Sequence, residues 1–115
     1  MNVETVYEEQ AKIFKALSDK KRLMILELLR GGEKCACVLT DQIHMGQPAL
    51  SYQMKILVAS GIVESRQEGK WTRYSLSPEG CERAKRLFDE FTAASEGAVA
   101  SQVLASAGEE ALLCR

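Results

Sequence analysis

Two cysteines separated by a single residue, Cys35 and Cys37, are the side chains of this sequence best suited to do chemistry. Thiolates are soft ligands that select soft or thiophilic ions. The charges of Arg30 and Lys34, and the N-terminus of the helix expected to begin here, should lower the pKa of both thiols. Residues at i and i+2 lie on different faces of an α-helix. We therefore expect the helix to bend or unwind when both thiolates bind one ion.

The other two cysteines, Cys81 and Cys114, stand far from this pair in the sequence. Each is either inert or the source of a further thiol ligand. The spacing of Cys35 and Cys37 is too short for a CxxC redox motif, and no second pair completes a zinc ribbon. The pair can also be explained as small buried hydrophobic residues. Two thiols within three residues favour a ligand site over that explanation.

The composition indicates a small soluble domain. The chain has 115 residues, of which 46% are hydrophobic and 27% charged, which suits one domain with a modest core. No apolar run approaches the length of a membrane span, and the N-terminus lacks the apolar stretch of a secretory signal. We therefore expect a cytoplasmic protein with reduced cysteines and no membrane partner. The net charge of −1 does not indicate nucleic acid, but the middle of the chain is mildly basic and the C-terminal part acidic.

The first half of the chain has the pattern of four helices. Ser18 is a suitable N-cap for the second helix, Gly31 and Gly32 end it, and Pro48 fits the first turn of the fourth. The apolar positions of the second helix include Leu23, Leu26 and Leu29. The expected helices span residues 4–17, 19–29, about 35–43 and 47 to about 60.

A hairpin and a last helix follow. Residues 62–66 and 71–76 are strand-like, and residues 67–70 have the composition of a hairpin turn. Ser77 and Pro78 begin the last helix. The order of helix, helix, short helix, turn, helix, hairpin and helix predicts a mainly α fold with a small β-hairpin, a winged helix-turn-helix.

This order also divides the chain. We expect residues 1–95 to form a dimeric DNA-binding and dimerisation domain, in which the fourth helix enters the major groove and the hairpin wing touches the flanking backbone. Residues 96–115 form an Ala- and Ser-rich tail that either extends the last helix or packs as a separate short one.

The fourth helix presents one face to the core and another to DNA. Leu50, Met54 and Leu57 make the buried stripe. Gln can pair with adenine, and Ser, Tyr and Lys reach phosphates or base edges. The residues expected to contact DNA from this helix are Gln47, Ala49, Ser51, Tyr52, Gln53 and Lys55.

Three basic residues of the hairpin, Arg66, Lys70 and Arg73, suit phosphate contacts. We expect Trp71 to pack beneath the wing rather than to stack on a base. The lone His44 is expected to be a polar surface residue at a helix end.

These segments together resemble the ArsR/SmtB family of metal- and metalloid-responsive repressors, over roughly residues 5–94. The resemblance implies a homodimer formed by the first and last helices, which binds a double-stranded inverted-repeat operator and releases it when an inducer binds. The matching segments are residues 17–26, Cys35-Ala36-Cys37, and residues 47–57, 60–63 and 69–76.

The resemblance also implies an inducer. The cysteine pair is similar to the arsenite and antimonite site of the arsenical-resistance members, which implies As(III) or Sb(III) as the metalloid ion and no required cofactor. Those members often have a third cysteine where this chain has Thr40. The third ligand is left open between Cys114, Cys81, and a small thiol or water.

Two other functions remain open at this point. The same fold can serve as a thiol redox or persulfide sensor, in which the two cysteines oxidise. A winged helix can also be a protein-interaction module that binds no DNA. An enzyme is not expected, because one histidine, no Gly-rich phosphate loop and no nucleophile–base pair make no catalytic constellation.

Overall fold

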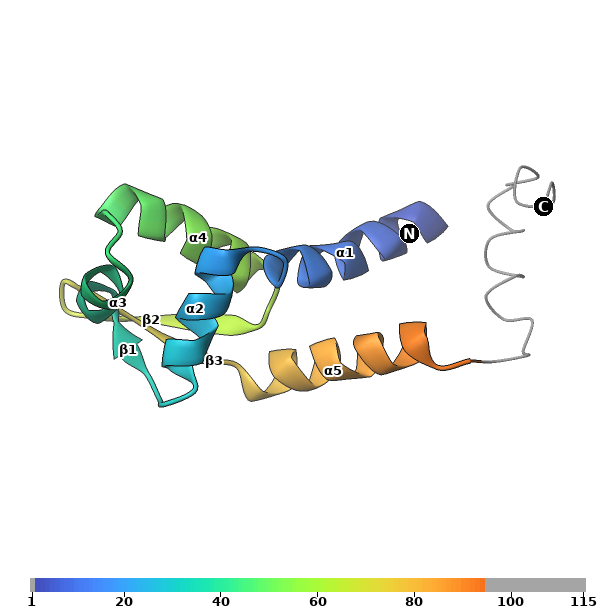
Figure 1. The fold of residues 1–115 in the computed structure, drawn as a ribbon. Coiled ribbons are helices and arrows are strands. Elements are labelled where there is room, and N and C mark those ends of the chain that lie inside the picture. The colour runs from blue at the N-terminus through green and yellow to red at the C-terminus, as the bar shows by residue number, and fades with distance from the viewer. Residues whose placement is uncertain (1, 95–115) are drawn as a thin grey trace.

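The helices and the hairpin follow one another in the order that the sequence predicts (Figure 1). The computed structural model describes residues 2–94. Its elements are α1 (Val3–Ala16), α2 (Lys20–Leu29), β1 (Lys34–Cys35), α3 (Ala36–Ile43), α4 (Gln47–Ala59), β2 (Val63–Glu68), β3 (Trp71–Leu76) and α5 (Pro78–Thr92). The winged helix-turn-helix is confirmed. No helix within the described range is long and apolar enough to cross a membrane.

The start of α2 differs from the prediction by one residue. Asp19, not Ser18, is the N-cap: its backbone is extended and its carboxylate accepts the Arg22 N–H at 3.2 Å. Ser18 instead donates its hydroxyl to the carbonyl of Lys15 at 2.8 Å, at the end of α1. Both residues are good caps, and the carboxylate also suits the positive end of the helix dipole.

The sheet contains a strand that the sequence did not predict. Its order is β1-β3-β2, with β1 and β2 both antiparallel to β3. The central pairing brings Cys35 opposite Arg73, and Arg73 opposite Arg66. The hairpin strands extend to Glu68 and from Trp71, so the turn is shorter than the predicted 67–70, with Gly69 at φ +63°.

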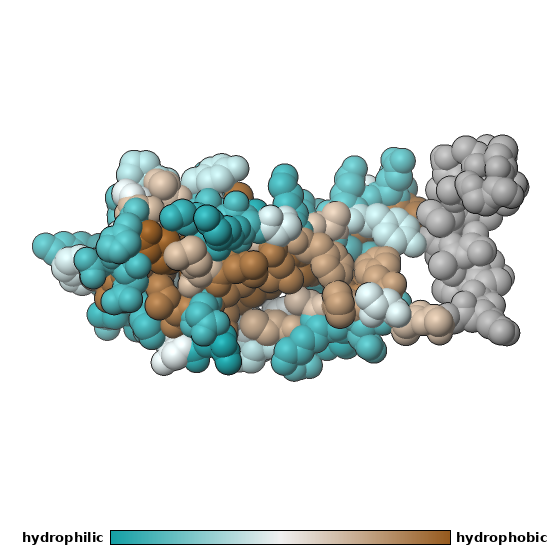
Figure 2. All heavy atoms as spheres, in the orientation of Figure 1, coloured by the Kyte–Doolittle hydropathy of each residue, from teal (hydrophilic) through white to brown (hydrophobic). Residues whose placement is uncertain are grey.

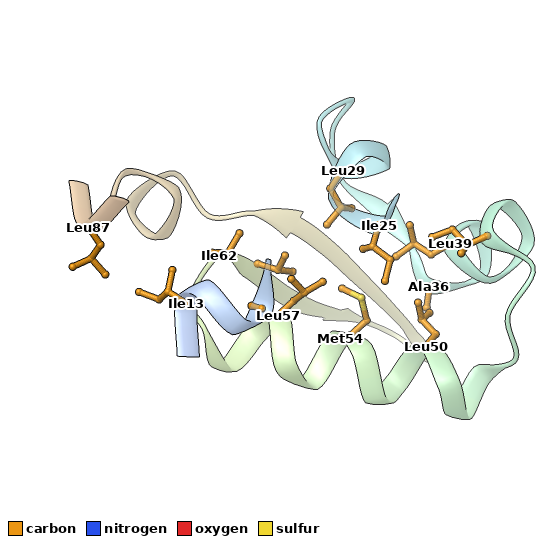
Figure 3. Close-up of a cluster of buried hydrophobic side chains, with 13 residues drawn as sticks. Ile13, Ile25, Leu29, Ala36, Leu39, Leu50, Met54, Leu57, Ile62 and Leu87 are labelled. Carbon is orange, nitrogen blue, oxygen red and sulfur yellow. The ribbon is translucent and has the colours of Figure 1, made fainter. Parts of the chain in front are cut away.

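The core lies between the helices and the inner face of the sheet (Figure 3). The predicted stripe of α4 is confirmed, since Leu50, Met54 and Leu57 are at most 1% exposed. Of the apolar positions of α2, Leu29 is buried and Leu23 is 51% exposed, while Ile25 is fully buried. α2 packs against α3, α4 and β3, and these elements set its buried face.

α1 and α5 lie side by side and extend away from the rest of the fold (Figure 1). Phe91 joins them, with its ring centroid 6.3 Å from that of Tyr7 and 6.0 Å from that of Phe14. The predicted tail, residues 96–115, and Cys114 lie outside the described residues.

Gly80, in the first turn of α5, packs directly against the backbone of Gly61. A Cβ at Gly80 would stand 1.7 Å from the carbonyl oxygen of Gly61. We expect Gly80→Ala to lower the free energy of unfolding by about 1–3 kcal/mol, because backbone rather than a flexible side chain has to move. Urea unfolding followed by circular dichroism measures the loss.

Gly31→Ala is the matched control. A Cβ there meets only ordinary contacts, with the Lys34 Nζ at 3.4 Å and the Leu28 carbonyl oxygen at 3.6 Å. Its effect should stay within about 0.5 kcal/mol. Equal losses in the two variants would show that the approach of Gly80 to Gly61 does not constrain α5.

Candidate functional site

The two thiols of the Cys35–Cys37 pair lie in direct contact. Their sulfur atoms are 2.6 Å apart. Cys35 is the N-cap of α3, with an extended backbone (φ −71°, ψ 147°), and its sulfur accepts the Cys37 N–H at 3.3 Å. The expectation that α3 must bend to bring both sulfurs to one ion was wrong. Because Cys35 precedes the first helical residue, the i, i+2 rule for helix faces does not apply to it.

The pair is electrostatically asymmetric. The contact with the Cys37 thiol lowers the pKa of Cys35, helped by the N–H groups of Cys37 and Val38 and by the charge of Arg73. The same contact raises the pKa of Cys37. Cys35 is buried and Cys37 is exposed, so the pair offers a buried sulfur beside an accessible one.

The prediction that the pKa of both thiols is lowered was partly wrong. The N–H groups at the helix N-terminus do lower the pKa of Cys35, but the pKa of Cys37 is raised. Arg30 is paired with Glu27, and the Lys34 ammonium contacts the Gly32 carbonyl. The positive charge that lowers the pKa of Cys35 is that of Arg73, because the β1–β3 register sets Arg73 opposite Cys35.

A third ligand is not assembled within residues 2–94. No three His, Cys, Asp or Glu side chains in this range are grouped to hold a metal ion. Thr40 donates its hydroxyl to the Cys37 carbonyl at 3.0 Å. Cys81 lies at the start of α5, with its sulfur 3.8 Å from the Ile62 carbonyl oxygen. Whether Cys81 or Cys114 completes the site stays a prediction.

Most of the predicted contact residues of α4 are exposed. They are Gln47, Ala49, Ser51, Tyr52 and Lys55. Tyr52 is 63% exposed, so its side chain does not pack in the core. Gln53 differs: it is half-buried, and its Oε1 accepts a hydrogen bond from the Arg22 Nη1 at 2.6 Å. This bond makes Gln53 a residue that positions α4.

A groove of about 260 Å³ separates α4 from the wing. Ser51 and Lys55 line it from the helix, and Ser65 and Tyr74 from the sheet. Burial raises the pKa of Tyr74, so its phenol stays a hydrogen-bond donor. Ser65 and Tyr74 were not among the predicted contact residues. The alternation of residues along the two strands is the signal that could have placed them on the side facing α4.

The two arginines of the wing are held by carboxylates. Arg66 makes a bidentate pair with Glu33, with Nε–Oε2 at 3.0 Å and Nη2–Oε1 at 2.6 Å. Arg73 bonds to Glu68, whose other oxygen is 3.7 Å from Arg66. These arginines lower the pKa of Glu33 and of Glu68, chiefly through the hydrogen bonds from Arg66 and Arg73 respectively.

The tip of the wing is more exposed than predicted. Trp71 is 49% exposed, so the expectation that it packs beneath the wing was wrong. The Lys70 ammonium lies 5.7 Å from its ring centroid, a cation–π arrangement. His44 is exposed at the end of α3, as predicted, and takes a left-handed conformation there.

An apolar surface covers the side-by-side helices α1 and α5. Phe88 and Phe91 are 61% and 54% exposed. Together with Tyr7, Ala11 and Phe14 they line a groove of about 490 Å³. Apolar side chains gather in the space between the two helices in Figure 2.

Comparisons with known proteins identify the family. A model described as a bacterial regulatory protein of the arsR family matches residues 19–65. An uncharacterised HTH-type transcriptional regulator of Methanocaldococcus jannaschii is 41% identical over 73% of this chain and 96% of its own. The arsenical resistance operon repressor of Staphylococcus xylosus is 38% identical over 79% of this chain and 88% of its own.

A solved structure agrees with the sequence relatives. The homodimeric winged helix-turn-helix DNA-binding domain of a possible ArsR-family regulator from Mycobacterium bovis superposes with a TM-score of 0.63 and 28% identity, over 93% of this chain and 87% of that one. These proteins are DNA-binding transcription regulators, not enzymes. The chain therefore belongs to the arsR family of bacterial regulatory proteins.

Proposed function

We propose that this protein represses transcription by binding operator DNA as a homodimer, and that As(III) or Sb(III) bound by Cys35 and Cys37 releases it. The observation that carries the proposal is the contact between the two sulfurs, 2.6 Å apart at the start of the helix-turn-helix. Two sulfurs already converged can bind one thiophilic ion without unwinding α3. The arsenical resistance operon repressor among the relatives supports the same inducer.

The exposed face of α4 and the polar groove beside it support DNA binding. Tyr52, Ser51 and Gln47 suit base edges in the major groove. Lys55 and the hydroxyls of Ser65 and Tyr74 suit the phosphate that passes between helix and wing. A regulator that works on DNA with reduced thiols acts in the cytoplasm.

The apolar surface of α1 and α5 supports a homodimer. Phe88 and Phe91 are too exposed for a monomer of this size to leave in water without cost. A second copy would cover them and set two α4 helices on one face of the DNA. The homodimeric Mycobacterium bovis domain is consistent with this arrangement.

The position of the cysteine pair gives the ligand a path to the DNA-binding elements. Cys35 ends β1, which pairs with β3 of the wing, and Cys37 lies in the first turn of α3. Ligand capture moves these two residues relative to one another, and the movement reaches both the wing and the helix that precedes α4.

Fluorescence anisotropy with a labelled duplex from upstream of the protein's own coding sequence tests the proposal. We expect a footprint of two half-sites about one helical turn apart, or a multiple of it. Arsenite should release the duplex in a phosphine reductant, which keeps thiols reduced without binding arsenic. Replacing Ser51 and Tyr52 with alanine should weaken binding while the circular dichroism spectrum stays unchanged.

The other outcomes identify the alternatives. If the protein binds no DNA, the remaining alternative is a protein-interaction module. Release by hydrogen peroxide but not by arsenite would indicate a redox sensor, in which two thiols and one peroxide give a disulfide and two waters. The proximity of the two sulfurs is the observation that favours this second candidate.

A further inference from the structure

The wing sheet carries a row of three side chains that runs from the cysteine pair across β3 to Arg66 of β2. Cys35 of β1 is opposite Arg73 of β3, and Arg73 is opposite Arg66 of β2. Residues directly opposite in antiparallel strands project from the same face of the sheet. The opposite face, which carries Ser65 and Tyr74, lines the groove beside α4.

Two arginines side by side in one row repel each other unless counter-ions lie between them. Glu68 supplies one carboxylate to both arginines, from within the hairpin itself. Glu33 supplies the other to Arg66 alone. With both carboxylates in place the cluster has no net charge, so these two arginines add nothing to the attraction of the wing for phosphate.

The Glu33–Arg66 pair differs from the other ion pairs of the described residues. Those join residues one turn apart on a helix or residues within the hairpin, whereas this one joins the wing to the segment that leads into β1. Its bidentate geometry is also the one by which arginine binds a phosphate group. Arg66 therefore cannot hold Glu33 and a DNA phosphate in this way at once.

We propose that Glu33 competes with operator phosphate for Arg66 and so sets how strongly the wing holds DNA. The inference rests on the proposed operator binding. Glu33 lies two residues before Cys35, in the short segment that also forms β1. Ligand capture at Cys35 therefore acts on the position of the carboxylate that competes with DNA, and release of the operator requires that it strengthen the hold of Glu33 on Arg66.

The pair is well placed to exchange partners. The side chains of Arg66 and Glu33 are 51% and 34% exposed, so water and salt screen their attraction. A phosphate on the polyanionic duplex can replace one carboxylate without burying a charge. Breaking the pair costs little, and its effect should appear in DNA affinity rather than in folding.

Glu33→Gln tests the inference, because it keeps the shape of the side chain and removes the charge that holds Arg66. We expect the variant to bind the operator about three- to tenfold more tightly than the wild type at moderate salt. The slope of log affinity against log salt should steepen by about 0.9 for each protomer, as one more phosphate contact forms. Fluorescence anisotropy over a salt series measures both.

Glu64→Gln is the matched control. Glu64 is exposed, lies on β2 two residues before Arg66, and makes no ion pair with any residue from 2 to 94. It removes the same charge from the strand and face that carry Arg66. The gain in operator affinity should be larger for Glu33→Gln than for Glu64→Gln. Adding Arg66→Gln to Glu33→Gln should abolish this difference.

The results separate this inference from the proposed function. If the wild type binds no DNA, the proposed function fails. If the wild type binds and the two variants behave alike, or if Glu33→Gln binds more weakly, competition by Glu33 is overturned. A weaker complex would mean that Glu33 orients Arg66 toward the duplex.

Discussion

Cys37→Ser is expected to hold its operator at arsenite concentrations that fully dissociate the wild-type complex. The concentration for half release should rise by about a hundredfold or more, because one remaining thiolate cannot chelate the ion. Operator affinity without arsenite should stay near normal, since Cys37 is exposed and α3 is capped by the Cys35 sulfur, which accepts the Cys37 backbone N–H. Titration of the anisotropy of a labelled operator with arsenite measures the shift.

Cys35→Ser should give the same loss of release for a different structural reason. Cys35 is buried and its sulfur accepts the Cys37 N–H at the start of α3. Serine is a preferred N-cap and can accept the same N–H, so the fold and the operator affinity should survive. A double Cys35→Ser, Cys37→Ser variant that still dissociates on arsenite addition would rule out this pair as the inducer site.

Cys81→Ser and Cys114→Ser serve as the controls and address the third ligand. Arsenic X-ray absorption without added thiols counts the sulfur atoms around the ion. Loss of one sulfur in either variant identifies the third ligand. An unchanged count in both would leave a two-cysteine site completed by water or a small thiol.

The parts of the fold that were predictable depend on local patterns. The stripe of Leu50, Met54 and Leu57 is an i, i+4, i+7 repeat, and the helix that carries it buries this face as expected. Pro48 in the first turn, Gly69 in the hairpin and Ser77 as an N-cap each mark a boundary by their own conformational preference. Each of these features can be recognised without knowing the neighbours in space.

The geometry of the cysteine pair was not predictable, because it depends on pairing between distant segments. β1 has two residues, too few for any alternation, and it exists because β3 offers a free edge. That pairing holds Cys35 in an extended conformation, just outside α3, and brings its sulfur to Cys37. The sequence shows both cysteines, but it does not show that α3 begins after Cys35, and this boundary is what brings the two sulfurs together.

The roles of charged side chains were hidden for the same reason. Lys20, Lys21 and Arg22 resemble an ordinary solvated run at a helix start, yet Arg22 is 6% exposed. Arg66 suited a phosphate, yet its partner Glu33 comes from a segment 33 residues earlier. Which member of a charge cluster is buried or paired is decided by tertiary contacts alone.

The buried guanidinium of Arg22 joins three elements. Its Nε donates to the carbonyl of Ala16 at 2.9 Å and its Nη2 to that of Lys15 at 3.0 Å, which satisfies the end of α1. Its Nη1 donates to the Oε1 of Gln53 in α4. One side chain of α2 thus fixes the angle between α1, on which dimerisation is proposed to depend, and the proposed recognition helix.

Arg22→Met is therefore expected to lower the free energy of unfolding by about 2–4 kcal/mol. Methionine fills a similar volume but leaves the Ala16 carbonyl and the Gln53 Oε1 without this donor, while the Lys15 carbonyl keeps its hydrogen bonds from Ser18. Urea unfolding at one fixed protein concentration measures the loss, since a dimer gains apparent stability with concentration. Lys20→Met, on the exposed side of the same turn, is the matched control and should change stability by about 0.5 kcal/mol or less.

Gln53→Met separates the link to α4 from the capping of α1. It removes only the acceptor on α4, so we expect a smaller loss of stability, about 1 kcal/mol, with a clear loss of operator affinity. In the double variant the loss of stability should be less than the sum of the two single losses, because both remove the same bond. If Arg22→Met proves as stable as Lys20→Met, the guanidinium does not hold α1 and α4 together. If instead Gln53→Met binds the operator normally, the bond between Arg22 and Gln53 does not position the recognition helix.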